Sequence, residues 1–171
     1  MKRAGDFSQA NPSSQVEIKS YEYTMKGHAE QCVDRYCELA GKSKQKLRRA
    51  GTPCIDDHMF ASVDFEKQGE LNLVASRIVL KMLYLARIGR PDTYWSVNTL
   101  ARDVTRWSVA CDKRLEKLAS YLQDTSTYVQ HAHVGDHAQD IYLALFSDAS
   151  FAGDVNDSKS TTGGHTMFGR S

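Results

Sequence analysis

The chain has 171 residues, and 41% of them are hydrophobic, which is enough to build a packed core in one domain or two small ones. Its 22 lysines and arginines are balanced by 21 acidic residues, so overall charge does not make it a nucleic-acid-binding protein. No apolar run approaches the roughly 20 residues that span a bilayer, and the polar N-terminus does not resemble a signal peptide. The sequence therefore predicts an intracellular protein, cytoplasmic or nuclear, with no membrane partner.

Residues 1–15 are polar and show no periodicity, so we expect them to be disordered. Residues 16–23 alternate loosely between apolar and polar side chains, which predicts a short strand. Residues 29–40 carry apolar side chains at helical spacing and predict an amphipathic helix that ends at Gly41.

Residues 42–49, with the sequence KSKQKLRR, form the most basic stretch and contain no acidic residue. They predict a phosphate-contacting patch, and an ordinary solvated loop is an equal alternative. The cations of this patch are Lys42, Lys44, Lys46, Arg48 and Arg49.

Residues 69–86 are apolar on more than one face and predict a buried helix. Asp92 follows the breaker Pro91 and is expected to cap a third helix. Residues 111–122 predict a fourth helix with a charged, solvent-exposed face. The third helix is expected to bury Trp95, Val97, Leu100 and Val104, and the exposed face of the fourth to carry Lys113, Arg114, Glu116 and Lys117.

After Thr125 the sequence changes character, because residues 128–132, 141–146 and 165–168 are short β-rich runs separated by glycine and aspartate. A boundary near residues 123–127 follows. The pattern predicts an α+β chain, helical over residues 16–125 and sheet-forming over residues 126–171.

The four cysteines are too few and too scattered for a disulfide scaffold, and we expect reduced thiols. A zinc module is an alternative, because Cys32, Cys37, Cys54 and His58 offer soft ligands. Cys32 and Cys37 lie roughly 140° apart around the predicted helix, so they could not hold one ion without breaking it. We favour the thiols.

Three stretches, in this order, resemble the copia-type retrotransposon Pol polyprotein. Residues 23–53 are similar to its reverse transcriptase thumb, where a helix precedes a basic linker and a Thr-Pro pair. Residues 78–125, which include ARIGRPDTYWSVNTLARDVTRW, resemble the segment that follows the polymerase. Residues 145–164, LFSDASFAGDVNDSKSTTGG, look like the opening strand and turn of its RNase H. The resemblance covers residues 16–171.

The resemblance implies a helical thumb- or connection-like region followed by the first strands of an incomplete RNase H-like sheet. The parent activities would be RNA-directed DNA polymerase and RNA–DNA hybrid ribonuclease, the latter with Mg²⁺ or Mn²⁺ held by carboxylates. Asp148 matches the first catalytic, metal-ligating aspartate. Asp154 and Asp157 fall in the predicted turn, and their residue type indicates that they are turn formers. Contacts to the phosphates and 2′-hydroxyls of the hybrid are expected from Ser158, Lys159, Ser160 and Thr161, with an ordinary polar hairpin equally favoured.

Most carboxylates of both parent sites are missing from this sequence. The remaining RNase H carboxylates would lie beyond Ser171, and the pair Asp56–Asp57 follows the thumb-like helix, where a loop or helix cap is expected instead of a polymerase site. We therefore expect a fragment of the polyprotein that is inactive alone and does not bind the metal stably. Its partners would be an RNA–DNA hybrid or other nucleic acid and the rest of the polyprotein. The alternative is a non-enzymatic nucleic-acid-binding or interaction protein.

Overall fold

The computed structural model describes residues 18–135, 139, 141–150 and 160–168. The expected disorder of residues 1–15 lies outside these ranges, as do the predictions for Asp154, Asp157, Ser158 and Lys159. The chain divides into two compact units, one formed by Glu22–Gln130 and the other by residues 1–21 together with 131–171.

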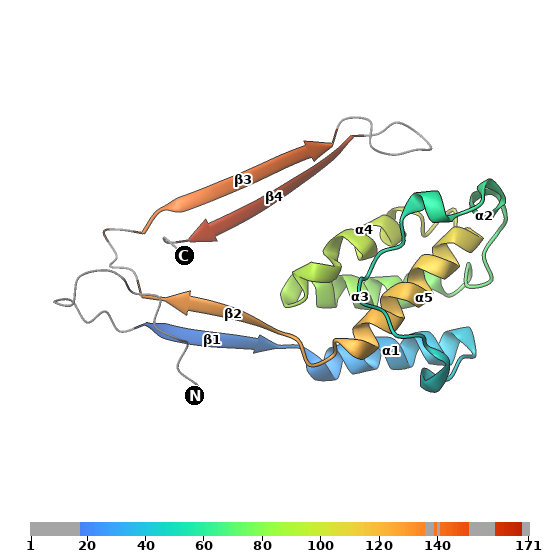
Figure 1. The fold of residues 1–171 in the computed structure, drawn as a ribbon, viewed down its shortest axis with the longest axis horizontal. Coiled ribbons are helices and arrows are strands. Elements are labelled where there is room, and N and C mark those ends of the chain that lie inside the picture. Colours follow the sequence, from blue (N-terminus) through green and yellow to red (C-terminus); the bar gives the residue numbers. More distant parts are fainter. Residues whose placement is uncertain (1–17, 136–138, 140, 151–159, 169–171) are drawn as a thin grey trace. The chain divides into compact units, whose positions relative to one another are not determined.

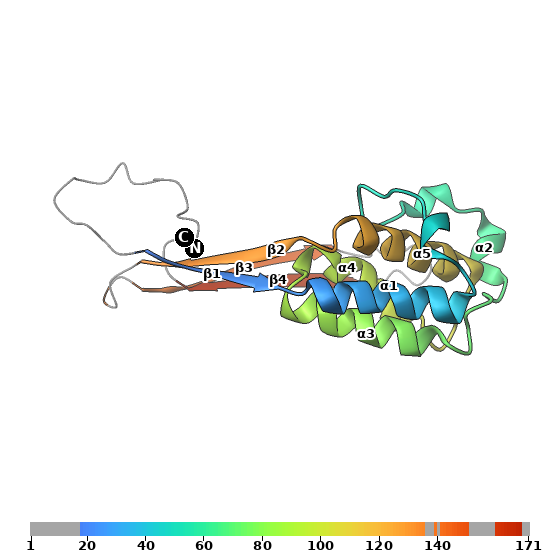
Figure 2. The same ribbon diagram turned by 90° about the horizontal axis from the view of Figure 1, so that it is seen from below.

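The first unit is helical and is built around the long helices α1, α3, α4 and α5 (Figures 1 and 2). Helix α1 packs against α3 and α5, and α4 likewise packs against α3 and α5, so these helices enclose one core. Among its fully buried side chains are Tyr36, Ile78, Met82, Leu85, Leu100, Leu115 and Leu118. In chain order the elements are α1 (Lys26–Ala40), η1 (Lys44–Lys46), η2 (Asp57–Met59), α2 (Ser62–Glu66), α3 (Ala75–Ile88), η3 (Pro91–Thr93), α4 (Tyr94–Arg102) and α5 (Val109–Asp124).

The predicted start of α3 at Gly69 is wrong, because the helix begins only at Ala75. The amide of Gly69 instead donates to the carbonyl oxygen of Trp107 at 3.1 Å, and the amide of Val109 donates to Lys67 at 2.9 Å. These hydrogen bonds connect the residues that precede α3 with the loop that precedes α5. By contrast, α1 ends as predicted at Gly41, which adopts a left-handed conformation with φ 61°.

The third helix differs from the prediction in its cap and in two of the residues expected on its buried face. Asp92 does not cap it, because residues 91–93 form the 3-10 helix η3 and the Asp92 carboxylate binds Arg90. Val97 and Leu100 are buried as predicted, whereas Trp95 is 55% exposed. Val104 follows the end of the helix at Arg102 and is only partly buried against the core. Trp95 precedes Val97 by two residues, which places it about 200° away around the helix axis and therefore on the opposite face.

The prediction of a charged, solvent-exposed face on the fourth helix is also wrong at one residue, Arg114. The side chain of Arg114 is only 12% exposed and pairs with Asp57. Its guanidinium carbon lies 5.2 Å from the ring centre of Phe60 and 5.6 Å from that of Phe65. Arg114 therefore anchors the segment that precedes α3 to α5 through an ion pair and cation–π contacts.

Strands β1 (Lys19–Thr24) and β2 (Val129–Val134) form one two-stranded sheet, and β3 (Leu143–Ser150) and β4 (Thr161–Phe168) form another, which is antiparallel. These elements correspond to the four predicted strands, with shifted ends, and the α+β class is confirmed. Leu145 and Phe146 of β3 are 71% and 58% exposed. None of the helices in the described part of the chain has the length and apolar character that crossing a bilayer requires.

Candidate nucleic-acid interface

The basic segment, residues 42–49, is held on the helical unit at two points. The side chain of Leu47 enters the core and is 8% exposed. The amide of Ala50, directly after the segment, donates to Oδ2 of Asp124 at 2.7 Å. The backbone that carries the cations is therefore positioned by contacts with the helical unit.

Two of the five predicted cations are paired with acidic residues from distant parts of the chain. Lys42 Nζ lies 2.7 Å from Oε2 of Glu116 in α5, and Lys44 Nζ lies 2.5 Å from Oδ1 of Asp34 in α1. The hydrogen bond to Asp34 raises the pKa of Lys44. A phosphate would have to compete with these carboxylates, so both lysines are weaker candidates for nucleic-acid contacts.

Lys46, Arg48 and Arg49, which we call the basic triplet, are exposed and have no ion pair with any described residue. Leu47 points into the core between them, so its neighbours in sequence face solvent. The structure thus reduces the predicted patch of five cations to three that are available to a phosphate.

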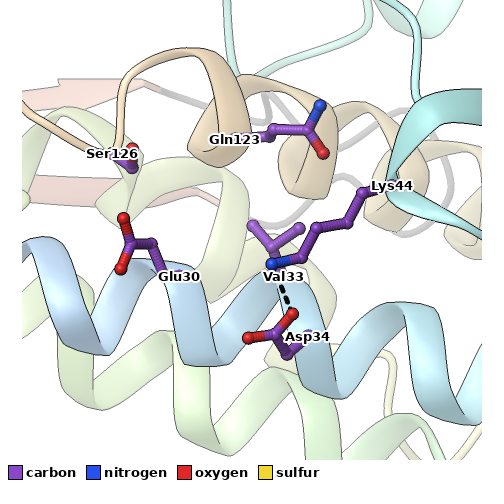
Figure 3. Close-up of a pocket in the computed structure, with 6 residues that line it drawn as sticks. All are labelled: Glu30, Val33, Asp34, Lys44, Gln123 and Ser126. Carbon is purple, nitrogen blue, oxygen red and sulfur yellow. Dashed lines mark ion pairs between the residues drawn. The ribbon is translucent and has the colours of Figure 1, made fainter.

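Lys44 also lines a cavity of about 280 Å³ between α1 and the end of α5. Figure 3 shows its side chain reaching across this cavity to Asp34, with Glu30 on the same helix. The side-chain oxygen of Gln123 is buried there without a hydrogen-bond partner among the described residues. Because carboxylates and a carbonyl oxygen line the cavity, it is unsuited to a phosphate, and the charge of Lys44 is directed to Asp34.

Asp148 lies within β3, where it pairs with Gly163 of β4. The side chain is exposed, and Asp148 is the single acidic residue in residues 141–150 and 160–168. Thr161 pairs with Ser150 at the end of the hairpin, and Ser160 directly precedes β4. Because Mg²⁺ needs an octahedral set of oxygen ligands, one carboxylate with water would hold it weakly. Within the described residues, no group of three or more His, Cys, Asp or Glu side chains could hold a metal ion.

The cysteines are free thiols, as predicted. Cys32 is fully buried, and this burial raises the pKa of its thiol to about 12. Cys54 lies in a different environment, with its sulfur 2.8 Å from the hydroxyl oxygen of Ser96. These positions do not support the alternative of a zinc module among the described residues.

One cationic surface was missed by sequence reasoning. Helix α3 exposes Arg77 and Arg87, and no acidic residue occurs between Leu71 and Pro91. The signal was present in the sequence as this acid-free stretch, but the apolar periodicity of a buried helix concealed it.

No family model matches the chain, and no curated protein or solved structure matches it. The resemblance to the copia-type Pol polyprotein therefore stays a prediction from the motifs. The structure itself defines an α+β protein with a helical unit and small antiparallel sheets.

Proposed function

We propose that this chain is a region of a copia-type Pol polyprotein that runs from the end of the reverse transcriptase into the start of RNase H, and that its helical unit binds nucleic acid through the basic triplet. The observation that carries the proposal is the ordered placement of Lys46, Arg48 and Arg49 around the buried side chain of Leu47. Binding does not then have to fix the backbone of a flexible loop, which would cost conformational free energy.

The triplet suits phosphates rather than a particular base sequence. Two arginines can each form paired hydrogen bonds with phosphate oxygens, and Lys46 adds a point charge. With a net charge of +1 for the chain, affinity comes from this local cluster and is sensitive to salt.

The position of Asp148 supports the RNase H part of the proposal. It lies within β3 and pairs with Gly163 of β4. The β3–β4 hairpin therefore brings together the two ends of the predicted RNase H motif, residues 145–164. Asp148 would supply one carboxylate ligand to Mg²⁺ or Mn²⁺. The other carboxylate ligands would come from residues that the structure does not describe. Ser160 and Thr161, at the start of β4, are proposed hybrid contacts.

A salt series of hybrid binding tests the triplet. Fluorescence anisotropy with a labelled RNA–DNA hybrid compares the wild type with Lys46→Gln/Arg48→Gln/Arg49→Gln. We expect the magnitude of the negative slope of log affinity against log salt to decrease by about 2 to 3, because each phosphate-bound cation contributes roughly 0.7 to 0.9. The matched control is Lys42→Gln/Lys44→Gln, which removes the paired cations and should change the slope by less than about 1. An unchanged slope in the triple variant would contradict the proposal.

Hybrid cleavage in Mg²⁺ or Mn²⁺ tests the role of Asp148. We expect this chain to leave the hybrid intact, because a two-metal site needs several converging carboxylates. Cleavage that Asp148→Asn abolishes would instead mean that this chain holds a complete nuclease site. Because no cleavage is expected in either case, the relative affinities distinguish the two interpretations. A preference for the hybrid over duplex and single strands would favour the RNase H origin, and equal affinity for all three would favour the alternative of a non-enzymatic nucleic-acid-binding protein.

A further inference from the structure

Helix α3 carries exposed apolar side chains along its outer side. Leu80, Tyr84 and Ile88 follow one another at four-residue intervals and are 59%, 55% and 51% exposed. Leu73, in the turn before the helix, is 90% exposed. Residues four apart lie on the same side of a helix, so Leu80, Tyr84 and Ile88 form one stripe, which we call the α3 stripe. The opposite side of α3, including Ile78 and Met82, is fully buried.

The charged side chains that α3 itself places beside this stripe are all cations. Arg77 and Arg87 are exposed, and neither forms an ion pair with a described residue. Lys81 donates to the neutral side chain of Gln31 at 3.2 Å, so its charge is not compensated by an acid there. Helix α4, which packs beside α3, contains no acidic residue. Helix α1 also packs against α3, and its three acidic residues are paired with cations: Glu30 with Lys26, Asp34 with Lys44 and Glu38 with Arg35. The surface is therefore apolar in the middle and positively charged along its length.

A second copy of this chain does not complement the α3 stripe. Antiparallel pairing of two α3 helices about Met82 would place Leu80 of one copy opposite Tyr84 of the other. The same register places Arg77 opposite Arg87, and parallel pairing places each arginine opposite its own equivalent. Like charges held face to face disfavour both arrangements.

We propose that the α3 stripe binds an amphipathic α-helix of another protein whose apolar side is bordered by aspartate or glutamate. The apolar side chains of that helix would cover Leu80, Tyr84 and Ile88, as in other helix-in-groove complexes. Its carboxylates would pair with Arg77 and Arg87. Nucleic acid fits this surface less well, because aliphatic side chains such as those of Leu80 and Ile88 offer no hydrogen bonds to phosphates or base edges. This surface is distinct from the basic triplet, and hybrid binding does not depend on it.

Two synthetic peptides and the full chain test the proposal. The first is a labelled amphipathic helix with leucine on one side and glutamate on both borders, and the second carries lysine in place of glutamate. We expect saturable binding of the acidic peptide in fluorescence anisotropy, weakened at least tenfold by Leu80→Lys. The matched control is Val63→Lys in α2, because Val63 is as exposed as Leu80 at 59%; this variant should bind like the wild type.

A charge reversal distinguishes specific ion pairing with the peptide from nonspecific hydrophobic binding. The variant Arg77→Glu/Arg87→Glu should bind the acidic peptide at least tenfold more weakly than the wild type does, and it should bind the basic peptide more tightly. Circular dichroism verifies that each variant keeps the helical content of the wild type. The proposal is overturned if the acidic peptide does not bind, or if Leu80→Lys leaves its affinity unchanged. Dimerisation through the stripe in sedimentation, abolished by Leu80→Lys, would overturn it in favour of a second copy. Binding of the stripe to anionic phospholipid vesicles without peptide binding would overturn it in favour of a membrane surface.

Discussion

Replacing Arg90 with methionine probes the ion pair at the corner between α3 and α4. The Arg90 side chain is 2% exposed, and its Nε and Nη2 donate to the two oxygens of Asp92 at 2.9 and 2.7 Å. Its Nη1 and Nη2 also donate to the backbone and hydroxyl oxygens of Thr125 at 2.9 and 2.7 Å. The guanidinium lies 5.7 and 5.4 Å from the ring centres of Tyr121 and Tyr128. One side chain thus joins this corner to the end of α5.

We expect Arg90→Met to lower the free energy of unfolding by about 3 kcal/mol. Removing one partner of a buried ion pair costs about 3 to 5 kcal/mol, because the other charge loses its compensation. Asp92 is 35% exposed and keeps the hydrogen bond from the Tyr121 hydroxyl at 2.9 Å, so the lower end of that range applies. Methionine retains much of the apolar volume of the arginine stem, which limits any cavity.

Urea unfolding followed by far-ultraviolet circular dichroism at neutral pH measures this loss. The control is Arg90→Met/Asp92→Asn, which removes the unpaired charge and should recover about 1 kcal/mol relative to Arg90→Met. A loss below about 1 kcal/mol for Arg90→Met would refute the reasoning, because the buried guanidinium would then contribute no more than an exposed ion pair does.

The same pair predicts how stability depends on pH. Burial raises the pKa of Asp92, but hydrogen bonds from Arg90 and Tyr121 outweigh it, and the net pKa is lowered. A carboxyl with a lowered pKa in the folded state stabilises the fold above its ordinary pKa, and this stabilisation is lost as the pH falls through the folded-state pKa. The stability difference between wild type and Arg90→Met should therefore narrow in acid. A constant difference would contradict this assignment.

Two further predictions concern packing and thiol chemistry. Gly69→Ala should lower the free energy of unfolding by about 2 kcal/mol in the same assay, because a Cβ there would lie 2.5 Å from the carbonyl oxygen of Ser108. Gly27→Ala in α1 is the matched control, since nothing lies within 4 Å of its Cβ, and an equal loss in both variants would rule out the clash as the cause. In the native protein at mildly alkaline pH, a thiol reagent should label Cys54 much faster than Cys32, because burial raises the pKa of the Cys32 thiol to about 12. Equal labelling rates by mass spectrometry would show that Cys32 is not protected.

The sequence predicted the helices and much of the core because apolar periodicity is a local property. Val97, Leu100, Leu115 and Leu118 are buried on the sides that the pattern indicated. Helix ends were predicted less well where distant groups determine them. Gly69 does not begin a helix because its amide donates to the carbonyl oxygen of Trp107. Asp92 caps no helix because its carboxylate binds Arg90 and also accepts a hydrogen bond from the hydroxyl of Tyr121, 29 residues further along the chain.

The candidate nucleic-acid interface was likewise predicted from the sequence only in part. The sequence determined that residues 42–49 carry five cations and that Asp148 follows a β-rich run, residues 141–146, whereas only the structure extends that strand to Ser150. Only the tertiary structure decided which cations are available, because Glu116 lies 74 residues from Lys42 in the chain but within hydrogen-bond distance in space. The interaction between charges depends on their separation in space and on solvent, which spacing along the chain does not record.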